Sequence, residues 1–412
     1  MAAAGCASYS FDGIDEDVRN ARYDAALKKL EKEKKIIYKN DAVRYYLDTG
    51  MIAHFSAQYE DSIKRLQNGD RAIEAAWTKS ISQSAASFIA NDTAVEYAGE
   101  DYEDLYLNVF NALNYYHCGN IEDALVEIRR MQEKLRKLSM RYNAAETELA
   151  RRNMEAAKKA DVKVNFSNSA LARYLSMLFY RAEGSRDDAR IDRDELKRAF
   201  EDQKNIYPYA PPSNIDDELS VPEDKARINF LAFAGLSPVK EEETIRIPLA
   251  DSNSWIKIAL PRMKARPSTA SKIEVVFDSG EKVKLALLED IERVATETFK
   301  KHKGIIEAKS IIRGTVKGGI AAGLMAADDD GALLLLGIAA QLFAETSEHA
   351  DLRIARYFPA RAYTGAINLK PGKYSFTVNY YNNSGKIAAS FDYKDVVLKQ
   401  DGLNLIETVF LD

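Results

Sequence analysis

The residues best able to do chemistry in this 412-residue chain are four histidines, two cysteines and a run of aspartates. The chain has no Gly-x-Ser-x-Gly turn for a nucleophilic serine and no Walker phosphate loop. None of the histidines has the spacing of a zinc-binding HExxH helix: they are His54, His117, His302 and His349. These patterns predict a protein that is not an enzyme and that needs no cofactor, no metal and no small-molecule substrate.

Two further motifs have a chemical and a structural interpretation. The carboxylates of 328–330 could bind a divalent cation, but the apolar stretch Gly331 to Ala344 follows directly, so we interpret the run as a helix cap. That stretch is shorter than the roughly 18 apolar residues of a membrane helix and predicts a buried helix. Small residues repeat every four or five positions just before it, which favours close helix contact, at Gly314, Gly318, Gly319 and Gly323.

Cys6 is the one candidate for covalent modification. The small residues of 3–5 precede it, as in bacterial lipoprotein signals whose cysteine thiol accepts a diacylglycerol. Only five residues precede Cys6, so the charged and apolar parts of such a signal are missing. We expect that a misplaced start or removal of the signal explains this, and that Cys6 is lipidated; the alternative is a chance Gly-Cys. Ala7 after the cysteine favours the outer membrane, facing the periplasm.

The elements that would position these residues divide the chain in two. All ten prolines lie at or after Pro208, and 1–207 contain none, which predicts a helical first half. We expect a tether over 1–14, helical repeats over 15–206 and a proline-rich linker over 207–224. The helices are predicted near 16–37, 41–56, 58–80, 102–117, 121–156, 167–183 and 186–204.

Helical hairpins recur in this half. The clearest copies span 115–125 and 180–189; weaker ones lie at 50–66 and 22–30, the last with only its second helix. Tyr23, Tyr59, Ile121 and Arg186 are equivalent positions, and they are separated by 36, 62 and 65 residues. The first spacing is close to the roughly 34-residue period of tetratricopeptide repeats. We expect small residues to let the helices approach each other, namely Ala26, Ser62, Ala124 and Ala189. Larger residues should fill the gaps between the helices, namely Leu30, Leu66 and Ile128.

Stacked helical hairpins bind other proteins along their concave face more often than they catalyse reactions. The first helix of each pair would line this groove, and tyrosine and arginine are frequent interface anchors. Packing between the helices is the alternative role of the same positions. The predicted groove residues are Leu47, Met51, His54, Val109, Leu113, Tyr116, Tyr174, Leu178 and Arg181.

After 224 the hydrophobic period becomes two, as in strands. We expect an α+β domain over 225–412, with strands within 226–284, helices over 285–347 and strands within 361–411. Turns are expected at 278–281, 371–372 and 382–385, and the segment 369–378 is typical of an edge hairpin in a β-sandwich. The predicted fold is therefore a tetratricopeptide-like solenoid followed by antiparallel, sandwich-like strands with a helical insertion.

Composition narrows the partners. A net charge of −5 with both signs interspersed gives no basic footprint for nucleic acid. The 22 tyrosines leave open a second class of function, stacking on sugars of peptidoglycan or another glycan. A hydrolase with an unusual carboxylate site is a third.

Two stretches carry a resemblance to a known family. The first is 91–135, with the run Gly99-Glu100-Asp101-Tyr102-Glu103 and the run 124–130; the second includes 350–353, 358–360 and 371–374. In this order they resemble largely uncharacterised bacterial lipoproteins with tetratricopeptide-like repeats. The resemblance implies a lipid on Cys6, an outer-membrane anchor and no known activity. We therefore expect a non-enzymatic scaffold that binds envelope proteins and touches the membrane only through its lipid.

Overall fold

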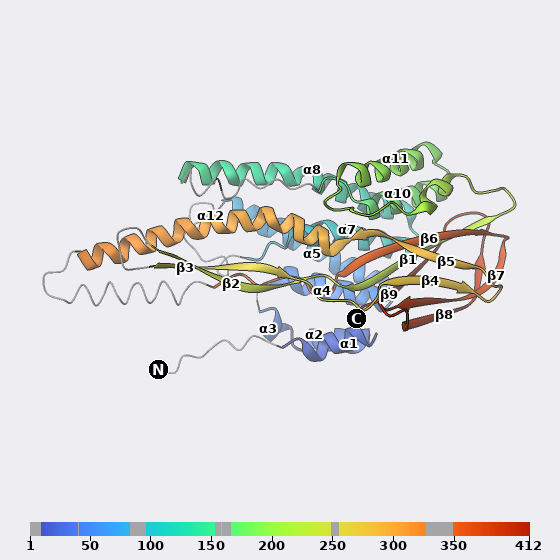
Figure 1. Cartoon of the computed structure of the whole chain (residues 1–412), viewed down its shortest axis with the longest axis horizontal. Coiled ribbons are helices and arrows are strands. Elements are labelled where there is room, and N and C mark those ends of the chain that lie inside the picture. The colour runs from blue at the N-terminus through green and yellow to red at the C-terminus, as the bar shows by residue number, and fades with distance from the viewer. Residues whose placement is uncertain are drawn as a thin grey trace.

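A computed structural model describes residues 10–39, 41–82, 96–152, 158, 166–248, 255–326 and 349–412. It shows an elongated molecule in which helices cover one side of a curled sheet (Figure 1). Cys6, 328–330 and the predicted helix 331–347 lie outside the described residues.

Helices make up the first half of the chain, as predicted. The predicted single helix over 16–37 is wrong, because the chain turns twice within it; the first helix begins at Asp12, inside the predicted tether. The helices are α1 (Asp12–Arg19), α2 (Tyr23–Lys32), α3 (Lys34–Ile37), α4 (Ala42–Phe55), α5 (Tyr59–Ser82), α7 (Asp101–His117), α8 (Ile121–Arg152), α10 (Ala170–Ala182) and α11 (Arg186–Asp202).

Four of these helices end in the same turn. Ala21, Ala57, Gly119 and Gly184 have positive φ angles of 54°, 57°, 78° and 78°. Each donates its N–H to the carbonyl three residues earlier, and the next N–H bonds to the carbonyl five residues earlier. This is the Schellman arrangement that satisfies the last carbonyls of a helix. The turns repeat at the predicted spacing, and α1 supplies the first helix of the copy at 22–30.

The helix pairs pack through the predicted small residues. Ala26, Ser62, Ala124 and Ala189 are fully buried, as are Leu30, Leu66 and Ile128. The hydroxyl of Ser62 donates to the carbonyl of Gly50 at 2.8 Å across α4 and α5. The seven positions are therefore buried, as the predicted packing of the hairpins requires.

The predicted linker is a packed strap. Tyr207, Ile215 and Glu218 are at most 2% exposed, and a short 3-10 helix, η2 (Ser213–Leu219), lies against α10 and α11.

Seven strands of the second half form one mixed sheet in the order β8-β7-β4-β5-β6-β1-β9. Its terminal strand β9 pairs with β1 in parallel, and the other pairs are antiparallel. The strands are β1 (Ala226–Leu236), β4 (Lys272–Phe277), β5 (Lys282–Asp290), β6 (Pro359–Leu369), β7 (Gly372–Tyr381), β8 (Ile387–Leu398) and β9 (Asn404–Phe410). A separate two-stranded ribbon comprises β2 (Val239–Pro248) and β3 (Trp255–Lys264) and packs on helix α12 (Ile291–Ala326).

Three predictions for this half are corrected. The strands form a curled sheet rather than a sandwich, because the inner face of that one sheet encloses a core of its own. Residues 285–290 belong to β5 and not to a helix, because they pair with β4 and β6. The alternate side chains Val283 and Leu285 point into the core inside the sheet. The segment 369–378 is not a hairpin, since β6 and β7 pair with other strands.

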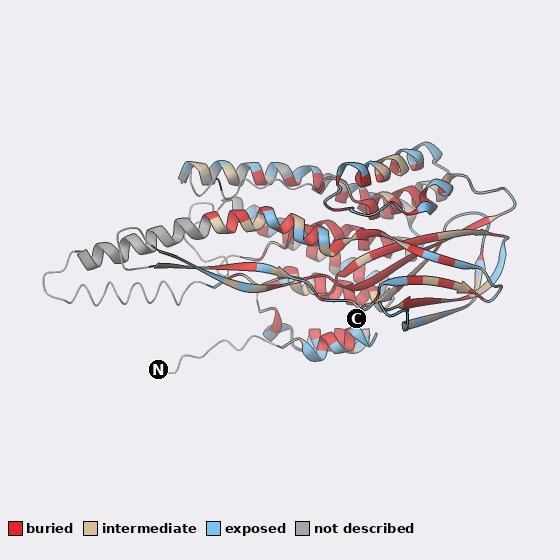
Figure 2. Cartoon of the chain, in the orientation of Figure 1, coloured by how far each residue is buried: buried red, intermediate tan, exposed pale blue. Residues whose placement is uncertain are grey.

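Strand β1 is buried on both faces along its whole length. Phe230 belongs to the core inside the curled sheet, whereas Leu231 and Phe233 belong to the core shared with the helices. That second core runs from Ile14 to Leu411 and draws on both halves of the chain. Figure 2 shows this continuous red layer of buried residues between helices and sheet. The α+β class is therefore realised with both halves sharing one core.

Helix α12 is the longest described helix and carries the glycines of 314–323 in helical backbone. Among the described residues, no helix combines the length and the hydropathy required to cross a membrane.

Candidate functional site

Helix α7 begins with the largest concentration of buried acids in the described structure. Glu100, Asp101, Glu103 and Asp104 are each at most 7% exposed. Negative charge is favoured near a helix N-terminus, where backbone N–H groups lack partners within the helix. Glu100 and Glu103 form a capping box. The helix dipole is thus one reason why the sequence gathers these carboxylates here.

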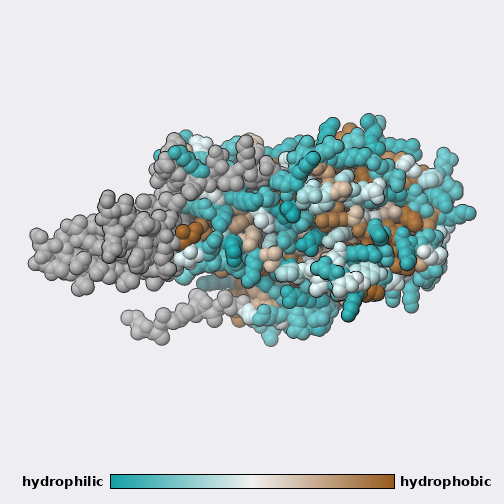
Figure 3. Space-filling view, viewed as in Figure 1, coloured by the Kyte–Doolittle hydropathy of each residue, from teal (hydrophilic) through white to brown (hydrophobic). Residues whose placement is uncertain are grey.

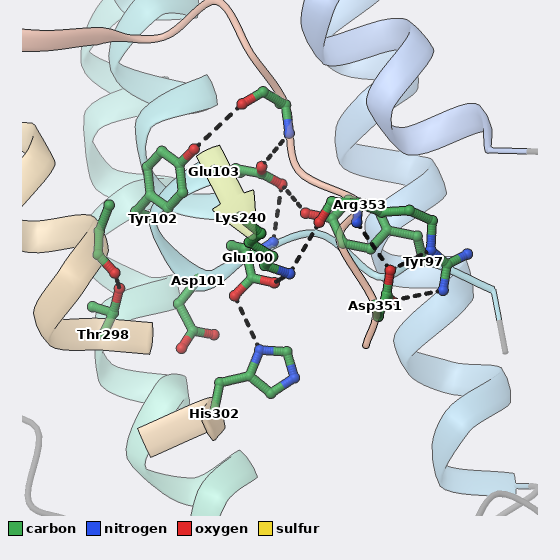
Figure 4. Close-up of polar contacts among 12 residues, drawn as sticks. Tyr97, Glu100, Asp101, Tyr102, Glu103, Lys240, Thr298, His302, Asp351 and Arg353 are labelled. Atoms are coloured by element: carbon green, nitrogen blue, oxygen red, sulfur yellow. Dashed lines mark hydrogen bonds and ion pairs between the residues drawn. The ribbon is translucent and has the colours of Figure 1, made fainter. Parts of the chain in front are cut away.

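Glu103 joins three segments of the chain. It accepts hydrogen bonds from the N–H of Ala355 at 2.6 Å, the N–H of Glu100 at 2.9 Å and the hydroxyl of Tyr97 at 2.8 Å. Burial and the charge of Glu100 raise the pKa of Glu103 to about 8, although these hydrogen bonds oppose the shift. Figure 4 shows the three donors converging on its two oxygens.

Glu100 is paired with cations from two other elements. Lys240 of β2 contacts one of its oxygens, and His302 Nδ1 of α12 lies 3.0 Å from the other. Burial alone would raise the pKa of Glu100, but Lys240 and His302 outweigh it and lower this pKa to about 2. Lys240 also donates to the carbonyl of Arg353 at 2.9 Å. We call Glu100, Glu103, Lys240, His302 and Ala355 the α7 junction.

Neighbouring carboxylates whose pKa values differ this much can divide acid and base roles in an enzyme. A general acid must also reach its substrate. Glu100 is 2% exposed and Glu103 is 0% exposed, and their hydrogen bonds end on other parts of the same chain. The geometry therefore favours a structural role for the junction.

A hollow of about 210 Å³ lies beside the junction between α5, α7 and α8. Lys134 Nζ lies 2.6 Å from carboxylate oxygens of both Asp70 and Asp104, and Arg130 pairs with Asp70 and Glu127. The charges at its base are thus matched within the chain. The described residues contain no group of histidine, cysteine and acidic side chains that could hold a metal. The lining residues are Asp70, Ile73, Glu74, Asp104, Arg130, Glu133, Lys134 and Lys137.

The predicted groove residues line the inner helical face, but this chain's own sheet and strap cover that face. Leu47, Met51, Val109, Leu113 and Leu178 are fully buried in the shared core. Their predicted exposure is wrong because the sheet packs on the helices through β1 and β9. The remaining four residues, His54, Tyr116, Tyr174 and Arg181, make polar contacts with the second half or the strap.

His54 and His117 hold the terminal strand. Their Nε2 atoms each lie 2.7 Å from one carboxylate oxygen of Glu407 in β9. Burial opposes the charged form of His54, but Glu407 outweighs it and raises the pKa of His54. Both histidines hold the pKa of Glu407 well below its usual range despite burial. We call these three residues the His-Glu-His clamp.

Tyr116 binds the backbone of the same strand. Its hydroxyl accepts from the N–H of Leu405 at 3.2 Å and donates to the carbonyl of Leu403 at 3.1 Å. This one hydroxyl therefore supplies both the acceptor and the donor that a neighbouring strand would offer at this edge of the sheet.

Tyr174 and Arg181 bind the strap and β1. The hydroxyl of Tyr174 accepts from the Asn229 amide at 3.0 Å, and Arg181 donates to the Asn229 oxygen at 2.8 Å. Arg181 also pairs with Glu218, and Arg227 Nε lies 2.8 Å from the same carboxylate oxygen. The inner helical face therefore recognises polar groups, and they belong to this chain.

Sequence reasoning missed the carboxylates that join the halves. Glu289 is fully buried, and it accepts hydrogen bonds from Tyr106, Ser169 and Tyr207 and from the N–H of Leu171. A signal existed for Glu407, which is the lone charge in the otherwise apolar and neutral strand Asn404–Phe410. A signal also existed for the junction, since four acidic residues gather within 100–104, at the start of a predicted helix.

Comparisons with family models, with curated proteins and with solved structures found no match.

Proposed function

We propose that this protein is a non-enzymatic scaffold of the bacterial cell envelope. In this proposal Cys6 carries a lipid that anchors the chain to the outer membrane, facing the periplasm, as in the lipoprotein family that the sequence resembles. The helical hairpins are a tetratricopeptide-like array, which the four identical turns at related spacing support.

The observation that carries the proposal is how the buried carboxylates are used. Glu103, Glu218, Glu289 and Glu407 each bond to a segment distant in the chain. Removing one partner of the buried ion pairs at Glu218 or Glu407 costs about 3–5 kcal/mol. Leaving a buried N–H group without Glu103 or Glu289 as its acceptor costs about 1–3 kcal/mol for each group. These contacts support a rigid body that presents a fixed outer surface, as a scaffold requires.

We place the partner surface on the outer faces of the helical hairpins. The inner face is covered by the sheet, whereas Val126 of α8 and Ile191 of α11 are 39% and 53% exposed. A tyrosine must be exposed to stack on a sugar, but many tyrosines of this chain are fully buried, which favours protein binding over sugar stacking. The largest fully buried side chains include Tyr38, Tyr102, Tyr106, Tyr174, Tyr207, Tyr357 and Tyr380.

The test is site-specific photocrosslinking in the native envelope, followed by mass spectrometry. A photoreactive phenylalanine derivative would replace Val126 or Ile191 on the outer face, and Tyr116 as an inner control of similar shape. The proposal expects one or two envelope proteins captured in stoichiometric amounts from the outer positions and none from Tyr116.

Capture from Tyr116 alone would show instead that a partner enters the inner face by displacing β9. Capture of muropeptides alone would overturn the scaffold in favour of glycan binding. Absence of labelled fatty acid on the full precursor, with Cys6→Ser as the control, would refute the lipid anchor.

A further inference from the structure

A group of exposed lysines covers α2, α3 and the turn that follows. In this acidic chain, 28–39 carry six lysines and two glutamates, a local charge of +4 against −5 for the whole. All six lysines are exposed. We call them the lysine patch: Lys28, Lys29, Lys32, Lys34, Lys35 and Lys39.

Most of this charge is free to meet a ligand. Glu31, which could neutralise it, pairs with Arg65 at 2.6 Å instead. Lys29 pairs with Asp17 at 2.5 Å, and Lys34 lies 3.7 Å from the ring centre of Tyr45. Within the described part of the chain, the remaining four form no ion pair: Lys28, Lys32, Lys35 and Lys39.

An apolar side chain lies among these lysines. Ile36 is 67% exposed, although its neighbour Ile37 is buried in the shared core. Exposed lysines next to an exposed apolar side chain suit the surface of a bilayer, where the charges meet the headgroups and the apolar group lies below them.

The patch lies close to the proposed lipid attachment point. Helix α1 begins at Asp12, six residues after Cys6, and an extended chain spans at most about 3.6 Å per residue. Cys6 therefore lies within about 22 Å of the start of α1. Helix α1 packs on α2, which contacts α3, and these helices form one layer along the lower rim of the molecule (Figure 1). In Figure 3 this rim is largely hydrophilic.

We propose that the lysine patch and Ile36 dock this face of the protein on an anionic phospholipid bilayer. The lysines would contact lipid phosphates, and Ile36 would enter the boundary between headgroups and acyl chains. A diacylglycerol on Cys6 would hold the chain at the membrane with two acyl chains but would not orient it, and a basic surface would add that orientation. The inference rests on the proposed lipid anchor and extends it by giving the anchored protein a fixed orientation.

The experiment measures vesicle binding by a chain that cannot carry the lipid. A negative result would therefore concern the lysine patch and not the lipid anchor. The full chain with Cys6→Ser is sedimented with vesicles of phosphatidylglycerol and phosphatidylcholine, or of phosphatidylcholine alone. We expect binding to the anionic vesicles only, and loss of binding as salt rises above physiological ionic strength.

Matched variants locate the surface. Replacement of Lys28, Lys32, Lys35 and Lys39 by Gln should weaken binding at least about tenfold, and Ile36→Gln should weaken it by a few-fold, roughly. The control replaces four other exposed lysines, Lys282, Lys284, Lys370 and Lys373, and removes the same charge from the sheet. Circular dichroism establishes that each variant is folded.

Equal binding by the patch variant and the control variant would overturn the proposal, as would equal binding to both kinds of vesicle. Incorporation of labelled fatty acid into the precursor, and its loss in Cys6→Ser, tests the lipid anchor separately. The two measurements can therefore fail independently of each other.

Discussion

Ala355 donates its backbone N–H to the carboxylate of Glu103 at 2.6 Å, although 252 residues separate them in the chain. Tyr102 and Phe358 pack beside this bond with ring centres 5.9 Å apart. The start of α7 and the segment before β6 thus meet in one place. Neither segment can satisfy its buried polar groups alone, so these hydrogen bonds form only when the two halves of the chain pack together.

Glu103→Ala should lower the free energy of unfolding by about 2–4 kcal/mol, because it leaves the buried N–H groups of Glu100 and Ala355 without an acceptor. Tyr97→Phe is the matched control, since it removes one of the three hydrogen bonds and should cost about 1 kcal/mol. Denaturant unfolding measures both. An equal loss of unfolding free energy in the two variants would contradict the inference that Glu103 joins all three segments.

The His-Glu-His clamp should make stability depend on pH in a definite direction. The folded pKa of His54 is raised above its ordinary value of 6.5, so its contribution is complete below pH 6.5 and disappears as pH rises through the folded pKa. The pKa of Glu407 is lowered from 4.5, so its contribution is present above pH 4.5 and is lost on acidification. The clamp therefore stabilises most between pH 4.5 and 6.5.

The variant His54→Gln tests this window. Between pH 4.5 and 6.5 it should cost about 3 kcal/mol, since it leaves Glu407 with only one of its two histidines. The cost should shrink at higher pH, where His54 is neutral. The control is His349→Gln, whose side chain is 65% exposed and whose curve should follow the unmodified protein. If His54→Gln lowers the free energy of unfolding equally at all pH values, His54 stabilises the fold by packing and not through its charge.

Tyr116 offers a local test of how the helices hold β9. Tyr116→Phe removes the hydroxyl that bonds to Leu405 and Leu403, and should cost about 1 kcal/mol. Hydrogen exchange of the Leu405 amide should accelerate in this variant, because its acceptor is gone. Unchanged exchange at Leu405 would mean that the tyrosine does not cap this edge. Replacement of both Tyr116 and Arg181 by Ala should lower the free energy of unfolding further, because it also breaks the buried pair of Arg181 with Glu218.

The helical hairpins could be predicted from sequence because their signals are local. A turn residue such as Gly119 and a small residue such as Ala124 specify a hairpin within a dozen residues. The proline-free first half extended this inference to most of the helices. Most strands could be predicted from alternating hydrophobic residues, because this signal is also local in the sequence.

The sequence identified the inner face of the helices, but it did not reveal that the chain's own sheet covers this face. The inner face of α4, α7 and α10 was identified by period, yet nothing near His54 indicates that Glu407 lies 2.7 Å away. Contacts across hundreds of residues depend on how the sheet curls, which one sequence does not reveal. Strand β5 was missed because its segment merges without a break into α12, with the boundary at Asp290 and Ile291.

Gly50 of α4 packs against Leu66 of α5, and it provides a test of the packing between these helices. A Cβ atom there would lie 2.7 Å from a methyl carbon of Leu66, closer than side chains tolerate. Gly50→Ala should therefore destabilise by about 1–3 kcal/mol despite the higher helix propensity of alanine. The additional replacement Leu66→Ala should make the two costs less than additive, because it removes the clash.

Gly119 supplies the control for Gly50. A Cβ atom at Gly119 would meet nothing within 4 Å, but its φ of +78° disfavours any side chain. Gly119→Ala should cost about 1 kcal/mol through the backbone alone, and no change at another side chain should relieve it. Thermal unfolding of both single variants, and of each combined with Leu66→Ala, separates the two causes. If Leu66→Ala interacts with Gly119→Ala as strongly as with Gly50→Ala, the contact between α4 and α5 is not what requires a glycine at position 50.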